Sequence, residues 1–124
     1  MDELPQAFPL RQKKGKPKKS PRYLTWIRGK RCLLCSVWYP IEAAHIRMSD
    51  FRFEKEAAGK GEKSDDKWAI PLCAPCHRAQ HERGDERKFW EEMKIDVVAR
   101  ADQLWREYNG ESVPNQDFDR VSAR

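Results

Sequence analysis

The sequence predicts a small α+β domain held together by zinc, with helices flanking a short β-structure. Three observations lead to this prediction. The chain has 124 residues, 39% of them hydrophobic and 36% charged, and a domain this small and polar often needs a staple such as a metal. All four cysteines fall into two CxxC pairs. A stretch rich in β-forming residues precedes the second pair, and stretches with helical periodicity follow it.

The whole chain carries a formal net charge of +5 and has a pI of about 9.1. This balance favours a polyanionic partner such as nucleic acid, although a basic protein without such a partner is the alternative. The N-terminus lacks the pattern of a secretory signal, and no apolar stretch approaches the roughly 18 residues of a membrane span. We therefore expect a cytoplasmic protein that does not contact a membrane and keeps its thiols reduced.

Residues 1–20 are predicted to form a disordered basic tail. Segment 11–20, "RQKKGKPKKS", has six basic residues and no acidic one, and its glycine and proline break any helix. The segment has no aromatic residue that could stack on bases, so we expect phosphate contacts without sequence readout, a solubilising arm being the alternative. The lysines expected to make these contacts are Lys13, Lys14 and Lys16.

The folded domain is predicted to span residues 21–109, followed by a flexible tail over 110–124. Its first element is a short helix with an apolar face, which ends at Gly29 and leads to the first cysteine pair. The next stretch, "SVWYPIEAAHIR", predicts strand, turn and strand, with the second strand ending near His45. A long polar loop follows, and the short apolar segment "KWAIPLC" leads to the second cysteine pair.

Three further helices are expected after the loop. The first runs from about Pro75 to Arg83 and ends at Gly84, because proline is tolerated in a first turn and glycine ends helices. Asp85 is the expected N-cap of "ERKFWEEM", and Asp96 that of "VVARADQLWREY". An apolar stripe at helical spacing is predicted to pack in the core: Val97, Val98, Ala101, Leu104, Trp105 and Tyr108.

The four cysteines are predicted to bind one structural Zn²⁺. Cys32 and Cys35 form the first CxxC knuckle, and Cys73 and Cys76 the second. Four thiolates at this spacing can surround zinc as a tetrahedron, and such a closed site does no chemistry. The alternatives are two redox pairs, which usually occur in a βαβ context that this sequence lacks, or ordinary buried cysteines. The 37 residues between the knuckles leave room for a functional insertion.

The three histidines are then free for a second site. His77 and His81 are four residues apart, so on a helix both side chains project from one face. This spacing is typical of two nitrogen ligands on one metal. His45 lies at the end of the predicted second strand. A lone histidine usually has a structural role, but three histidines near one zinc knuckle favour a functional one.

The pattern "CLLC…EAAHIR…SDDKWAIPLCAPCHRAQH" resembles the HNH, or ββα-metal, nuclease superfamily. In that pattern a strand carries a histidine followed by a hydrophobic residue, and after a loop "LCxxCH" opens a helix. Over roughly residues 21–106 the chain is similar to a phage-associated HNH-like family grouped with the Ref recombination nuclease. The resemblance implies a ββα-metal fold and a nuclease of a bacterial or phage-infected cell.

The resemblance also implies a role for each matched residue. His45 would be the general base that activates water. His77 and His81 would hold a catalytic divalent cation, Mg²⁺, Mn²⁺ or Zn²⁺, beside the scissile phosphate. Asp66, or its neighbour Asp65, would supply a carboxylate as a ligand or orienting group, the alternative being that both are turn residues. The partner would be DNA, held mainly through its backbone, together with a recombination or phage replication protein.

Two positions depart from the typical HNH pattern. Many members place an Asp or His directly before the general base, where this chain has Ala44. The middle Asn of the usual pattern aligns with Trp68. We expect Asp66 to compensate for these losses.

Basic residues around the proposed second site are expected to contact phosphates, with affinity that falls as salt rises. Each alone is more often a solvated surface charge. These residues are Arg47, Arg52, Lys60, Lys63, Lys67 and Arg78.

Three functions fit these patterns. The first is a metal-dependent endonuclease that hydrolyses DNA phosphodiester bonds. The second is a non-catalytic zinc module, derived from an HNH domain, that binds DNA or protein. The third, a thiol-redox protein, has the least support. The histidines favour the first, whereas Ala44 and Trp68 favour the second.

Overall fold

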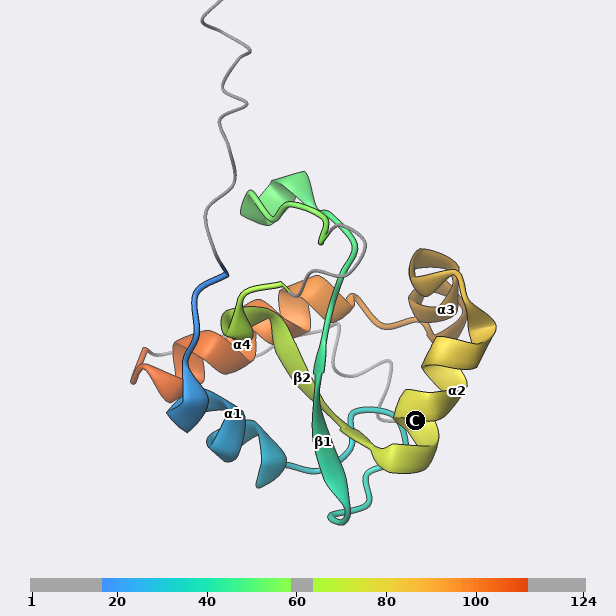
Figure 1. Cartoon of the computed structure of the whole chain (residues 1–124), viewed down its shortest axis with the longest axis horizontal. Coiled ribbons are helices and arrows are strands. Elements are labelled where there is room, and N and C mark those ends of the chain that lie inside the picture. Colours follow the sequence, from blue (N-terminus) through green and yellow to red (C-terminus); the bar gives the residue numbers. More distant parts are fainter. Residues whose placement is uncertain (1–16, 59–63, 112–124) are drawn as a thin grey trace, which may run out of the picture.

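The structure is a computed structural model that describes residues 17–58 and 64–111 (Figure 1). Within these residues the chain forms a two-stranded sheet and four α-helices, which confirms a small α+β fold. In chain order the elements are α1 (Pro21–Arg28), β1 (Ile41–His45), the 3-10 turns η2 (Phe51–Phe53) and η3 (Asp66–Trp68), β2 (Ala69–Cys73), α2 (Ala74–Arg83), α3 (Glu86–Met93) and α4 (Val97–Tyr108).

The sheet pairs β1 with β2 in antiparallel register, from Ile41 opposite Cys73 to His45 opposite Ala69. Every residue of β2 is buried. The cause is visible in Figure 1: α1 lies on one side of the sheet, α2 on the other, and α4 crosses behind it. Because β2 runs directly into α2, a strand–strand–helix unit forms with the long loop between its strands.

One predicted strand does not form. The segment before Pro40 was expected to pair as a strand, and that prediction is wrong. The backbone amide of Cys32 donates to Val37 O, and that of Ser36 donates to Cys32 O. These bonds curl the chain into a tight knuckle, and Ser36 adopts a left-handed φ of 68°. The first cysteine pair therefore decides the local backbone, despite the β-forming side chains.

The predicted helix ends are confirmed, because each depends on local chemistry. α1 is followed by Gly29, and α2 by Gly84 at a φ of 84°, which glycine adopts without strain. The carboxylate of Asp85 accepts a hydrogen bond from the amide of Lys88, and that of Asp96 accepts one from the amide of Ala99. Both caps satisfy amides that have no partner inside their helix.

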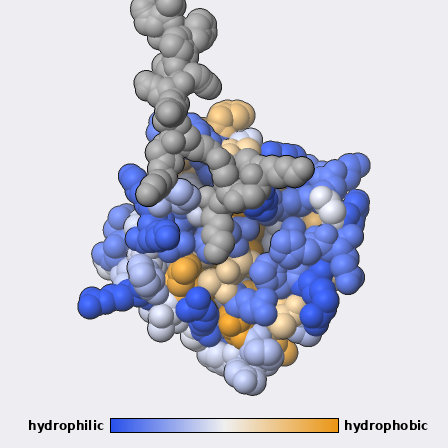
Figure 2. All heavy atoms as spheres, viewed as in Figure 1, coloured by the Kyte–Doolittle hydropathy of each residue, from blue (hydrophilic) through white to orange (hydrophobic). Residues whose placement is uncertain are grey.

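The core lies between the sheet, α1 and α4. The apolar stripe of α4 contributes to it as predicted: Val97, Val98, Ala101 and Leu104 are buried, while Trp105 and Tyr108 are partly buried against them. Figure 2 shows that most of the face in this view is hydrophilic, with hydrophobic side chains confined to a smaller area. Among the described residues, no helix has the length and apolar character needed to cross a bilayer.

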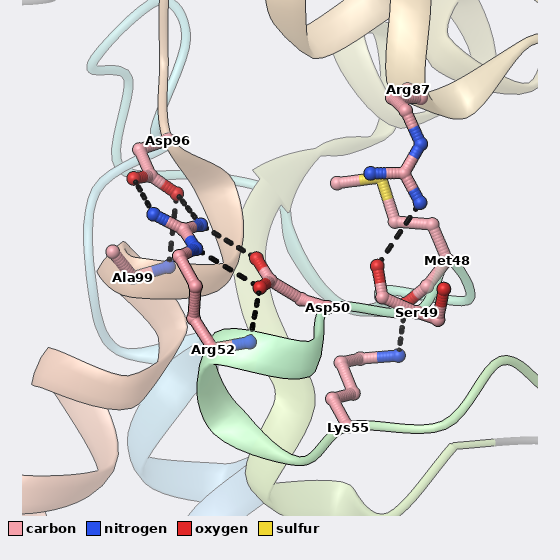
Figure 3. A network of polar contacts seen from close by, with 8 residues as sticks. All are labelled: Met48, Ser49, Asp50, Arg52, Lys55, Arg87, Asp96 and Ala99. Atoms are coloured by element: carbon pink, nitrogen blue, oxygen red, sulfur yellow. Dashed lines mark hydrogen bonds and ion pairs between the residues drawn. The ribbon is translucent and has the colours of Figure 1, made fainter.

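The loop after β1 is tied to the helices by a polar network (Figure 3). The Arg52 guanidinium binds both carboxylate oxygens of Asp50 at 2.9 and 2.6 Å and both of Asp96 at 2.9 and 2.8 Å. The Arg52 hydrogen bonds lower the pKa of both carboxyl groups. The buried Lys55 ammonium donates to Met48 O at 2.6 Å. Arg52, which the sequence predicts to contact phosphate, therefore joins the loop to the start of α4.

Candidate functional site

The four cysteines gather where the first knuckle meets the junction of β2 and α2. Cys32 and Cys35 lie on the loop after α1, Cys73 ends β2, and Cys76 lies in the first turn of α2. The four Sγ atoms all lie within 4.8 Å of one another, and Cys35 Sγ is 3.6 Å from Cys73 Sγ. Zinc bound by four thiolates places its sulfurs about 3.8 Å apart, given Zn–S bonds of about 2.3 Å. The cluster can therefore hold a metal such as zinc.

Backbone amides in this cluster stabilise a negatively charged sulfur. Burial raises the pKa of the Cys32 thiol, but backbone hydrogen bonds outweigh burial and hold that pKa at about 7. Two of these donors are the amides of Leu34 and Cys35, each 3.4 Å from Cys32 Sγ. Burial raises the pKa of the Cys73 and Cys76 thiols. A cation is what would let these thiols ionise together, as zinc does for its cysteine ligands.

A second group of residues meets at the other end of the sheet, where β1 ends and η3 begins. His45 Nε2 lies 2.8 Å from Asp66 Oδ1, and the backbone amide of Ser20 donates to Asp66 Oδ2 at 2.7 Å. An ionised carboxylate only accepts hydrogen bonds, so Nε2 carries the proton of a neutral His45 ring. Nδ1 then keeps its lone pair. This tautomer suits a proton acceptor whose ring is fixed by a partner.

The residues before α1 pair with the segment that holds Asp66. The amide of Lys18 donates to Asp65 Oδ1 at 2.8 Å, and the amide of Asp66 donates to Lys18 O at 3.0 Å. Asp65 thus has a backbone partner, whereas Asp66 contacts both a histidine ring and a backbone amide. Sequence reasoning did not predict that the end of the basic segment positions Asp66. No local signal marks this contact, because its partners are 46 residues apart.

The third group consists of the two histidines of α2 and a glutamate of β1. His77 Nε2 lies 3.2 Å from His81 Nε2, so the predicted shared helix face is confirmed. Two nitrogens on one tetrahedral zinc are about 3.3 Å apart, given Zn–N bonds of 2.0–2.1 Å. His77 Nδ1 lies 2.7 Å from Glu42 Oε1. A carboxylate on the far nitrogen of a histidine is the usual way to orient a metal ligand.

Glu42 is the residue that sequence reasoning missed. Alternate residues of a strand share a face, so Glu42 and Ala44 face the same side of β1. Ala44 is buried in the core. Glu42 therefore places a carboxylate beside His77, two residues before the position where the sequence has Ala44. The alternation of β1 was the available signal.

The structure does not bring all the predicted ligands together. Asp66 contacts His45, and no contact joins it to His77 or His81. Within residues 17–58 and 64–111, only the four cysteines form a group of three or more possible ligand atoms within 4.8 Å of one another. Asp66 therefore belongs with the predicted general base, and Glu42 with the histidine pair.

Comparison with known families identifies the family of this chain. The profile of one family, described as a protein of unknown function (DUF968), matches residues 1–98. The chain belongs to the DUF968 family. The match includes all four cysteines, all three histidines, Glu42 and Asp66. No curated protein and no solved structure matches the chain.

In this DUF968 protein, the residues predicted to contact phosphate have different surroundings. Arg78 is exposed on α2, one residue beyond His77. Lys67 lies 3.9 Å from the Asp102 carboxylate and stacks over the Trp68 ring at 4.6 Å. Arg47 donates to Ala58 O at 3.5 Å. The remaining predicted contacts lie outside the described residues: Lys13, Lys14, Lys16, Lys60 and Lys63.

Proposed function

We propose that this protein is a metal-dependent endonuclease that hydrolyses DNA phosphodiester bonds, with an active site of the HNH type. The observation that carries the proposal is the pairing of His45 with Asp66 at the end of β1. Three further features support it: the strand–strand–helix order, the histidine pair on α2, and the four-cysteine cluster at the start of that helix.

His45 acts as the general base. Asp66 accepts the Nε2 hydrogen bond and keeps Nδ1 available to take a proton from water. The Ser20 amide fixes the second oxygen of Asp66, so the carboxylate has a single orientation. A positioned general base typically accelerates a reaction by about 10²–10⁴-fold.

His77 and His81 would hold the catalytic cation, because their Nε2 atoms lie 3.2 Å apart on one face of α2. Such a cation, when bound, neutralises charge on the scissile phosphate and the leaving oxygen. Glu42 accepts a hydrogen bond from His77 Nδ1 and thereby directs the lone pair of Nε2 toward His81. Zinc held by the four-cysteine cluster would have a structural role, because four thiolates leave no open coordination position.

The test is nicking of supercoiled plasmid with Mg²⁺, Mn²⁺ or Zn²⁺, comparing wild type with His45→Ala. Wild type is expected to nick in at least one cation, and the variant to lose about 100-fold or more in rate. Glu82→Ala, an exposed change on α2, is the matched control and should keep full activity. The proposal fails if wild type nicks with none of the cations, or if His45→Ala nicks as fast as wild type.

A second function is favoured by the burial of Ala44 and Trp68. Typical HNH enzymes carry polar residues at these two positions, but here both side chains are part of the core. The chain would then be a non-catalytic zinc module that binds DNA or protein. This function would be identified if the wild-type protein holds one zinc and binds a DNA fragment but never nicks DNA.

A further inference from the structure

The segment between the first knuckle and β1 exposes large side chains to solvent. Val37, Trp38 and Tyr39 have exposed fractions of 41%, 59% and 84%. In the part of the chain that the structure describes, five large hydrophobic side chains are exposed, and these are three of them. A contiguous exposed group of this kind marks an interaction surface more often than single scattered residues do.

Basic side chains lie against the aromatic rings of the same region. The Arg31 guanidinium stacks on the Trp38 ring at 4.5 Å, and Lys30 Nζ lies 4.2 Å from the centre of the Trp26 ring. Neither cation is in an ion pair within the described residues. Stacking on one face of Trp38 leaves the rest of its ring accessible, because more than half of the side chain is exposed.

These rings and cations line one groove of about 780 Å³ between α1, the first knuckle and α4. Its charged lining has three basic side chains and one acidic: Lys30, Arg31, Arg100 and Glu107. Basic side chains therefore outnumber acidic ones in the lining of this groove, which also contains the Trp26 and Trp38 rings. This combination matches a polyanion whose planar groups are free to stack.

We infer that Lys30, Arg31 and Trp38 of this groove bind single-stranded nucleic acid together with the exposed Tyr39, which follows Trp38 in the chain. Unpaired bases stack on the Trp38 and Tyr39 rings, and Lys30 and Arg31 contact the phosphates. Bases within a duplex are already stacked on their neighbours, so exposed rings favour an unpaired strand. An acidic peptide would satisfy the cations but would offer no planar groups for the rings.

The inference is independent of nuclease activity. The aromatic segment leads into Ile41 at the start of β1, whereas His45 ends that strand. Binding here therefore needs neither His45 nor a catalytic cation. A protein that does not nick plasmid can still bind oligothymidine through this surface. A protein that does not bind oligothymidine here can still nick plasmid.

The experiment measures fluorescence anisotropy of a labelled oligothymidine of about 20 nucleotides with the full zinc-loaded chain and no added divalent cation. The Trp38→Ala/Tyr39→Ala variant loses two stacking contacts and should therefore bind at least about 10-fold more weakly. Arg31→Ala should lower the slope of log K against log salt by about 0.7 for one lost phosphate contact. A duplex of the same length should respond less to the aromatic substitutions.

Two matched variants serve as controls. Phe51→Ala removes another exposed aromatic ring, 90% accessible, and should bind as wild type does. Met93→Ala, which removes a hydrophobic side chain that is 42% exposed on α3, should also bind as wild type does. Tyr39→Ala alone, at a highly exposed position, should lose affinity while the fold and zinc content stay intact. Unchanged affinity in both the Tyr39 and the double variant overturns the inference. Loss of self-association in sedimentation velocity, with oligothymidine affinity retained, also overturns it and identifies a contact between copies.

Discussion

The two ends of the small sheet are held by different chemistry. At the end where Ile41 pairs with Cys73, four sulfurs come together in one cluster. At the opposite end, where His45 pairs with Ala69, hydrogen bonds join the sheet to the loops. Asp66 binds the His45 ring there, and the Ser64 hydroxyl donates to Ile46 O at 2.6 Å.

The two ends thus separate stabilisation of the fold from orientation of a polar side chain. A metal bound by four thiolates contributes much folding energy and leaves no reactive position. Hydrogen bonds contribute about 1 kcal/mol each, yet they hold a histidine in one orientation with a free ring nitrogen. Substitutions at the two ends are therefore expected to differ in effect, and the cysteine cluster should be the more sensitive end.

The largest effect is expected from Cys73→Ser, which removes one thiolate from the four-cysteine cluster. Structural zinc contributes about 10–16 kcal/mol of binding energy in zinc-finger peptides, as much as the whole stability of a typical domain of about 5–15 kcal/mol. The variant should lose zinc and cooperative thermal unfolding, as measured by metal analysis and circular dichroism. Ser36→Ala, on the same knuckle, should keep both. A zinc-free variant with the wild-type melting temperature would contradict a structural metal.

Glu42→Gln is expected to weaken cation binding by His77 and His81 about 10–100-fold, because the carboxylate that orients His77 is lost. The measurement is calorimetric titration of Zn²⁺ into protein that already holds one equivalent. The cysteine-bound zinc should remain. The control is Glu82→Gln, an exposed change on α2, the helix that carries His77 and His81. Equal affinity in Glu42→Gln and wild type would show that Glu42 does not position the histidine.

Asp66→Asn is expected to lower the proposed nicking rate by about 10-fold, a part of what His45→Ala removes. An amide can still accept from Nε2–H, but its NH₂ group cannot accept from the Ser20 amide, so the ring is held less firmly. Plasmid nicking gives the rate, and zinc analysis should show one bound zinc as in wild type. Asp65→Asn, beside it, should have a smaller effect. A full rate in Asp66→Asn would remove Asp66 from the site.

The smallest effect is expected from Arg52→Met in the network of Figure 3. Arg52 is 49% exposed, so solvent screening limits the loss of stability to about 1 kcal/mol at neutral pH. Its hydrogen bonds lower the pKa of Asp50 and Asp96. Their contribution is therefore complete above about pH 4, the ordinary Asp range, and is lost as pH falls through the lowered values.

Urea unfolding of wild type and Arg52→Met at several pH values checks this sign. The difference in stability between them should be largest at neutral pH and should shrink in acid. Arg83→Met, which breaks the exposed pair with Glu92, is the matched control and should change stability less. A difference that grows in acid would contradict the assigned role of the two carboxylates.

Local chemistry explains which elements could be predicted. Gly84, Asp85 and Asp96 act on neighbouring residues, so the helix ends follow from a few positions of sequence. The strand expected around Trp38 failed because side-chain preference there competes with the backbone bonds of the cysteine knuckle. The pairing of Ser20 with Asp66 could not be predicted, because only the packed chain brings such distant residues together.

Short stretches of sequence were enough to predict the four-cysteine cluster, the helices and the shared face of His77 and His81. Ligand spacing, caps and helical periodicity are properties of short segments. Which carboxylate contacts which histidine depends instead on the tertiary structure. The antiparallel register and the packing of α2 on β1 bring Glu42 to His77, and η3 brings Asp66 to His45. These partners are 35 and 21 residues apart, so their pairing depends on the global fold.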